Sequence, residues 1–176
     1  MNVYFDNAAT TQIRKEVIDS ISSVMNDSFG NPSSTHAFGR NAKKYVETAR
    51  KKIASLLNAS PQEIIFTSGG TESDNMVLCC AVKDLGVKTI ISSPIEHHAV
   101  IHALEALNKI HKVKVDYINI DNYGSIDLEQ LEVLLKKDNS KKLVSLMHVN
   151  NEIGNILDIK MVGKLCHENG AFFHTD

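Results

Sequence analysis

The feature that most constrains the fold is a regular alternation of two hydrophobic patterns from residue 61 onward. Short apolar runs rich in β-branched residues, which are typical of strands, alternate with stretches whose apolar residues recur at helical spacing. The runs place five expected strands at 64–67, 88–92, 113–120, 143–149 and 171–175. The fourth run is nearly all apolar, so we expect it to be buried on both faces. This alternation is typical of an α/β domain with a mostly parallel sheet and flanking helices.

The first sixty residues follow a different pattern. Apolar residues at helical spacing predict one amphipathic helix within 17–25 and a longer one within 38–57, whose basic side we interpret as a solvated face rather than a nucleic-acid patch. Between them, residues 28–36 are rich in turn formers and predict a fixed loop of the kind that often carries function. We therefore divide the chain into an amino-terminal helical segment with loops, 1–60, and an α/β domain, 61–176.

Composition excludes several classes of function. The 176 residues carry a net charge of −2, which gives no general attraction to nucleic acid or to acidic membranes. No apolar run has the length of a membrane span, and the first residues lack the pattern of a signal peptide, so we expect a cytoplasmic protein that acts on small molecules. The three cysteines argue against a disulfide framework. We expect Cys79, Cys80 and Cys166 to be small core residues.

The stretch at 67–75, Thr-Ser-Gly-Gly-Thr-Glu-Ser-Asp-Asn, marks a turn from a strand into a helix. Gly69 and Gly70 let an outside group approach the main chain, and the first N–H groups of a helix have no intrahelical partner. Such a turn can bind an anion, and the Thr71 hydroxyl adds a donor. Glu72 and Asp74 lower the positive potential, so both must point away from any phosphate. The alternative is a plain turn before a capped helix.

Polar residues follow several of the predicted strands, and in a parallel sheet these positions converge on one rim. They are residues 68–71, Glu96 with His97, Asn150 with Asn151, and 174–176. A phosphate-binding turn, an imidazole, an amide and a carboxylate together suit a pyridoxal phosphate site. The carboxylate of such a site keeps the cofactor ring nitrogen protonated, which makes the ring an electron sink.

Six motifs, in order along the whole chain, resemble those of the cysteine desulfurases. They are Tyr-Phe-Asp-Asn-Ala-Ala-Thr-Thr at 4–11, Phe-Gly-Asn-Pro-Ser-Ser at 29–34, the turn at 66–75, Glu-His at 96–97, Met-His-Val-Asn-Asn-Glu-Ile-Gly at 147–154 and His-Thr-Asp at 174–176. That family belongs to the class V aminotransferase group and has the fold-type I pyridoxal phosphate architecture. The resemblance implies that residues 61–176 are part of its large, cofactor-binding domain.

The resemblance also implies roles for individual residues. Gly70 and Thr71 would bind the cofactor phosphate, His97 would stack on the ring and take part in proton transfer, Asn151 would contact the phenolic oxygen, and Asp176 would contact the ring nitrogen. The plainer alternatives are a histidine that starts a helix, a turn amide and a frayed chain end. His98 and His102 lie four residues apart on a helix, but no third ligand is evident, so we expect no metal site.

Other functional residues of the family have no match in this sequence. These are the Schiff-base lysine after a Ser-x-His motif, the mobile catalytic cysteine and the arginine that binds the substrate carboxylate. The resemblance therefore implies the amino-terminal part of a cysteine desulfurase, inactive alone, whose first strand at 64–67 pairs with a strand encoded after Asp176. Without that neighbour, we expect a loosely packed or aggregating chain.

The activity implied for the complete enzyme is removal of sulfur from L-cysteine, which yields L-alanine and an enzyme persulfide for Fe–S cluster or thio-cofactor assembly. Implied partners are a second copy, in a homodimer, and a sulfur acceptor or Fe–S scaffold protein. Two alternatives stay open at this point: a non-catalytic module that docks partners of sulfur transfer, and a related class V aminotransferase or selenocysteine lyase.

Overall fold

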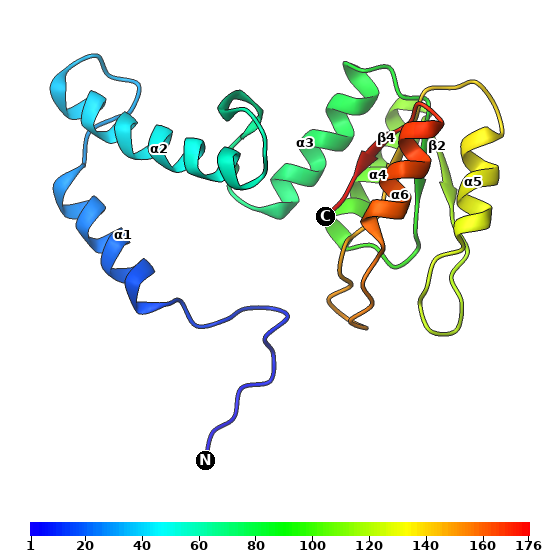
Figure 1. Ribbon diagram of the computed structural model, residues 1–176, viewed down its shortest axis with the longest axis horizontal. Helices are drawn as coiled ribbons and strands as arrows, with labels where there is room; N and C mark the ends of the chain where they lie inside the picture. Colours follow the sequence, from blue (N-terminus) through cyan, green and yellow to red (C-terminus); the bar gives the residue numbers. More distant parts are fainter. The chain divides into compact units, whose positions relative to one another are not determined.

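The computed structural model describes residues 1–176, which form two compact units, Met1–Phe66 and Thr67–Asp176 (Figure 1). The first unit contains α1 (Lys15–Asp27), α2 (Ala37–Leu56) and a 3-10 turn (Pro61–Glu63). The second contains α3 (Gly70–Lys83), β1 (Thr89–Ser92), α4 (His98–His111), β2 (Lys114–Tyr117), α5 (Leu128–Lys136), β3 (Lys142–Ser145), α6 (Ile159–Glu168) and β4 (Phe172–His174). The finer expectation of a boundary after residue 60 stays a prediction.

In the first unit, both predicted helices are present, and the loop between them packs closely against α2. A Cβ atom on Gly30 would collide with the carbonyl of Phe38, and one on Gly39 would collide with the carbonyl of Ser34. Only glycine allows this approach of two backbones. The helix α1 buries none of its residues.

The predicted strand at 64–67 is wrong. Residues 64–67 are in neither a strand nor a helix, and the side chains of Ile65 and Phe66 are exposed. The guanidinium of Arg50 donates to the carbonyl of Ile64 and lies 4.8 Å from the centre of the Phe66 ring. An apolar, β-branched run becomes a strand only when a neighbouring strand satisfies its backbone groups, and none lies beside it here.

The sheet of the second unit contains the other four predicted strands, all parallel, in the order β2-β1-β3-β4. The central strands β1 and β3 are fully buried, which agrees with the expectation for the first part of the run at 143–149. Beyond Ser145 the chain continues to form backbone hydrogen bonds with β4 and the residues after it. The N–H of Leu146 donates to the carbonyl of His174 (3.1 Å), and the N–H of His148 donates to the main-chain oxygen of Asp176 (2.8 Å). His148 and Val149, at the end of the predicted strand, are exposed, so the expected burial does not extend to this end.

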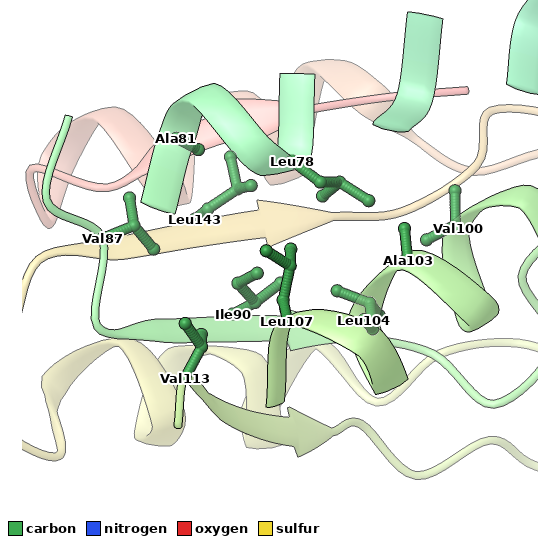
Figure 2. Close-up of a cluster of buried hydrophobic side chains, with 10 residues drawn as sticks. All are labelled: Leu78, Ala81, Val87, Ile90, Val100, Ala103, Leu104, Leu107, Val113 and Leu143. Carbon is green, nitrogen blue, oxygen red and sulfur yellow. The ribbon is translucent and has the colours of Figure 1, made fainter. Parts of the chain in front are cut away.

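Two hydrophobic clusters cover the two faces of the sheet, because successive residues of a strand point to opposite faces. On one face, α3 and α4 pack over Ile90 and Leu143 (Figure 2). On the other, α5 and α6 pack over Ile91 and Val144. These layers confirm the predicted fold class, an α/β domain with a parallel sheet and flanking helices.

The prediction that all three cysteines are core residues is right for Cys166, which is buried, and wrong for Cys80, which is exposed. Cys79 is partly buried and packs against the first cluster. Helical spacing could not settle which of two adjacent cysteines faces the sheet.

The topology leaves a crevice at one end of the sheet. The helix after β1 covers one face and the helix after β3 covers the other, so the chain leaves these two neighbouring strands in opposite directions. In open α/β sheets, ligands bind outside the carboxyl ends of the strands at such a point.

None of the helices combines the length and the apolar character that a membrane span requires.

Candidate functional site

The start of α3 presents unpaired backbone donors. Gly69 caps the helix without a side-chain hydrogen bond, and the N–H groups of Gly70, Thr71 and Glu72 have no partner in the structure. A Cβ atom built on Gly69 or Gly70 would meet no atom within 4 Å, so the space beside the turn is open. Partial positive charge at a helix start, together with free N–H groups, makes this end of α3 suited to an anion.

Ser68 holds the acidic side chain in this turn. The Glu72 carboxylate accepts hydrogen bonds from the Ser68 N–H (2.6 Å) and the Ser68 hydroxyl (2.7 Å), which lower the pKa of Glu72. Thr67 and Ser73 close the turn from the other side through their hydroxyls, 2.7 Å apart. The turn is thus fixed by its own side chains, and its free amides are left for another group.

One helical turn further, Asp74 is buried against β4 and is 3% exposed. Its Oδ1 lies 3.5 Å from Nε2 of His174, whose Nδ1 lies 3.0 Å from the Ser145 hydroxyl. Burial raises the pKa of Asp74, and the nearby Asp176 carboxylate raises it further. Burial lowers the pKa of His174, against the opposing effect of the two carboxylates.

Sequence reasoning missed this contact between Asp74 and His174. It assigned Asp74 only a place in the first turn of a helix. One signal was available: His174 and Asp176 are two residues apart in an extended segment and therefore share a face. The partner on α3 could not be predicted, because the register of a helix over a sheet is set by packing.

His97 caps α4. Its Nδ1 accepts a hydrogen bond from the Ala99 N–H (3.2 Å), which agrees with the plainer alternative of a histidine that starts a helix. Its other ring nitrogen has no hydrogen-bond partner, and its ring is exposed. The charge of His97 lowers the pKa of Asp74. His97 and Asp176 thus lie within electrostatic reach of one buried carboxylate on the helix that begins at Gly70.

The buried side chains of Glu96 and Asn150 join the loop after β1 to the loop after β3 by hydrogen bonds. Glu96, 6% exposed, accepts from the Ser93 hydroxyl (2.6 Å) and from the Met147 N–H (2.8 Å). The side-chain amide of Asn150 donates to the Ile95 carbonyl (2.8 Å). Burial raises the pKa of Glu96 to about 7, although both hydrogen bonds oppose the shift.

A cavity of about 360 Å³ lies in the crevice between these loops. Its lining is mostly apolar and comes from three segments, 93–96, 123–128 and 146–158. Glu96 and Asn150 belong to its wall. None of the five predicted site residues lines it, so the cavity and the start of α3 are separate features.

The structure brings the predicted site residues together only in part. Gly70 and Thr71 lie at the exposed start of α3, and His97 and Asp176 lie near Asp74. Asn151 is exposed and donates to the Glu152 carboxylate (2.9 Å), without a hydrogen bond to the others. The assignment of these residues to a cofactor stays a prediction.

The rings of His98 and His102 stack with their centres 5.4 Å apart. No group of three or more metal-ligating side chains occurs in the structure.

The family description "Aminotransferase class-V" matches residues 3–176. The chain belongs to this family. Two similar curated proteins are the cysteine desulfurase IscS of Dictyoglomus turgidum, 44% identical over 99% of this chain and 44% of the relative, and that of Methanosarcina thermophila, 45% identical over 99% and 43%. A solved structure titled NifS-like protein superposes with a TM-score of 0.93 at 38% identity, over 100% of this chain and 49% of the other.

These comparisons confirm the resemblance to the cysteine desulfurases and agree with the α/β fold class. The chain spans less than half the length of these curated relatives. Class V aminotransferases and cysteine desulfurases are pyridoxal phosphate enzymes as a family.

Proposed function

We propose that this chain forms the phosphate-binding and ring-binding part of a pyridoxal 5'-phosphate site in a cysteine desulfurase. The observation that carries the proposal is the start of α3, where the N–H groups of Gly70 and Thr71 are unpaired and face open space. A phosphate group is an anion that such a helix start is suited to bind. The likeness of the whole chain to cysteine desulfurases supports the choice of cofactor and substrate.

The residues present fit the cofactor at both of its ends. At the phosphate end, Thr71 adds a hydroxyl donor to the free amides, and Ser68 already holds the Glu72 carboxylate. At the ring end, Asp176 supplies a carboxylate acceptor, and its main chain is fixed by the hydrogen bond from His148. The frayed chain end that the sequence left open therefore has a fixed backbone in this structure.

Each residue would have a distinct task. Gly70 and Thr71 would hold the phosphate, Asp176 would pair with the ring nitrogen, and Asn151 would donate to the phenolic oxygen. His97 would stack on the ring and move a proton, for which its unpartnered ring nitrogen is free. When bound, pyridoxal phosphate supplies an electron sink for the substrate carbon.

The reaction we propose cleaves the carbon–sulfur bond of L-cysteine. The sulfur passes to an enzyme thiol as a persulfide, the carbon skeleton takes up a proton and leaves as L-alanine, and no oxidant is needed. The lysine, thiol and arginine of this reaction have no match among residues 1–176, so we expect no turnover by this chain alone. We also propose a cytoplasmic homodimer that delivers sulfur to an acceptor or Fe–S scaffold protein.

The test is to express the full-length gene product, add pyridoxal phosphate and measure alanine and persulfide formed from L-cysteine. The proposal predicts both products in equal amounts. Selenocysteine as the preferred substrate would identify a selenocysteine lyase, and transfer of an amino group would identify an aminotransferase. Failure to bind the cofactor would contradict the proposal and favour the alternative of a non-catalytic module that docks partners of sulfur transfer.

A further inference from the structure

We propose that Glu96 is a positioning residue, whose carboxylate ties the loop after β3 to the loop after β1 and so fixes His97 and Asn151 relative to each other. The inference rests on the proposed function, because it concerns the geometry of a cofactor site. It assigns a task to a buried acid that touches neither the free amides of α3 nor the Asp74 cluster.

The first step is the placement of the hydrogen bonds. Glu96 directly precedes His97, and Asn150 directly precedes Asn151. In both bonds across the crevice the loop after β3 donates to the loop after β1: the Met147 N–H donates to the Glu96 carboxylate, and the Asn150 side-chain amide donates to the Ile95 carbonyl, each at 2.8 Å. Two such bonds, each one residue away from a proposed site residue, fix the separation of the two backbones.

The second step concerns burial. The side chains of Ser93, Glu96 and Asn150 are 1%, 6% and 6% exposed, so water has little access to their polar atoms. A buried donor that loses its partner costs about 1–3 kcal/mol. The loop after β3 therefore cannot leave Glu96 without leaving the Met147 N–H unpaired.

The third step is the chemistry of a carboxylate in this place. Glu96 uses one oxygen for Ser93 and the other for Met147. A glutamine fits the same space: its oxygen accepts from Met147 and its amide donates to the Ser93 hydroxyl. An alanine keeps neither bond. Gln is therefore the conservative replacement and Ala the disruptive one.

Several charged groups face Glu96 and shape its titration. They are Asp74 of α3 and Asp176 after β4, which both raise its pKa, the neighbouring His97, and Asp158 across the cavity. Protonation removes one acceptor site from the carboxylate and weakens the link. The link in the wild type consequently loosens as the pH falls through the pKa of about 7, and a Gln variant lacks this change.

The experiment uses the full-length gene product and compares wild type, Glu96→Ala, Glu96→Gln and Asn150→Ala. Cofactor affinity is measured by titration with pyridoxal phosphate, and amide hydrogen exchange at Met147 is measured without cofactor. Thr89→Val is the matched control. It removes the contact of a buried hydroxyl with the Ser140 hydroxyl (3.1 Å), which joins the start of β1 to the segment before β3, at the opposite end of the sheet.

We expect Glu96→Ala to weaken cofactor binding about tenfold, which is the scale of one lost buried hydrogen bond. The same substitution should speed amide hydrogen exchange at Met147. Glu96→Gln should restore both values at pH 7.5. The ratio of its affinity to that of wild type should show an inflection near pH 7, because only wild type carries the titrating carboxylate. Thr89→Val should lower the melting temperature without changing affinity.

The inference is overturned if Met147 exchange is unchanged in Glu96→Ala, or if Thr89→Val weakens binding as much as Glu96→Ala does. If Glu96→Ala does not fold, an unchanged pH profile in Glu96→Gln overturns it. A wild type that binds no pyridoxal phosphate, with intact Met147 protection, refutes the proposed function and the positioning role while the link itself stands.

Discussion

The start of α3 and the crevice between β1 and β3 lie in the same unit, but they treat polar groups in opposite ways. In the crevice, the side chains of Ser93, Glu96 and Asn150 are buried, and each has a hydrogen-bond partner. At the start of α3, the amides of Gly70 and Thr71 are exposed and unpaired. The difference teaches that the crevice is built to hold a shape and the helix start is built to bind. Substitutions in the crevice should therefore change stability, and they should change affinity only through the placement of His97 and Asn151. Substitutions at the helix start should change affinity with little effect on stability.

The largest expected effect on stability is the pH dependence from Glu96. Its pKa is raised to about 7 in the folded state, so the folded protein binds more protons than the unfolded chain between about pH 4.5 and 7. The free energy of unfolding then falls as the pH rises through this window, by about 3 kcal/mol from this group. Glu96→Gln should gain this amount over wild type between pH 4.5 and 8 in urea unfolding. A constant difference at both pH values would contradict the burial of a titrating carboxylate.

A second prediction separates two adjacent histidines of the proposed site. His97→Gln should lower turnover of the full-length gene product about 100-fold, because general acid–base catalysis typically contributes that much. His98→Gln is the matched control and should leave turnover unchanged. Steady-state alanine production measures both, and a more damaging effect of His98→Gln would show that the assignment is wrong.

A third prediction concerns Asn150. Its side chain accepts from the N–H groups of Glu152 and Ile153 and donates to the Ile95 carbonyl, so Asn150→Ala unpairs three backbone groups. We expect a loss of about 2 kcal/mol in the free energy of unfolding. Asn151→Ala, in the same turn but exposed, should have almost no effect on unfolding. Equal losses would remove the distinction between a structural and an exposed amide.

The smallest expected effect is at Thr71, which should change affinity and leave stability nearly constant. Thr71→Ala should weaken pyridoxal phosphate binding by about 1–2 kcal/mol, the scale of one charge-assisted hydrogen bond. Cofactor titration and thermal unfolding of the same samples measure the two quantities. A large loss of stability with unchanged affinity would reverse the comparison between the helix start and the crevice.

The periodicity of the apolar residues predicted the α/β layers, because the buried face of a strand or helix is determined by the spacing of apolar residues within that element. It failed where a structure depends on a distant partner. Residues 64–67 have the composition of a strand but no neighbour to pair with, and Cys80 has the spacing of a core residue but faces out. Glu96 and Asp74 could be placed near the ends of their elements, but the Met147 amide and the His174 ring that meet them lie 51 and 100 residues away in the sequence.

The central claim is that the free amides at the start of α3 bind the cofactor phosphate. A crystal structure of the full-length gene product with pyridoxal phosphate tests it directly. We expect the phosphate within hydrogen-bond distance of the Gly70 and Thr71 N–H groups, with the ring nitrogen beside the Asp176 carboxylate. A phosphate bound in the cavity lined by Glu96, with the amides of α3 left free, would contradict the account.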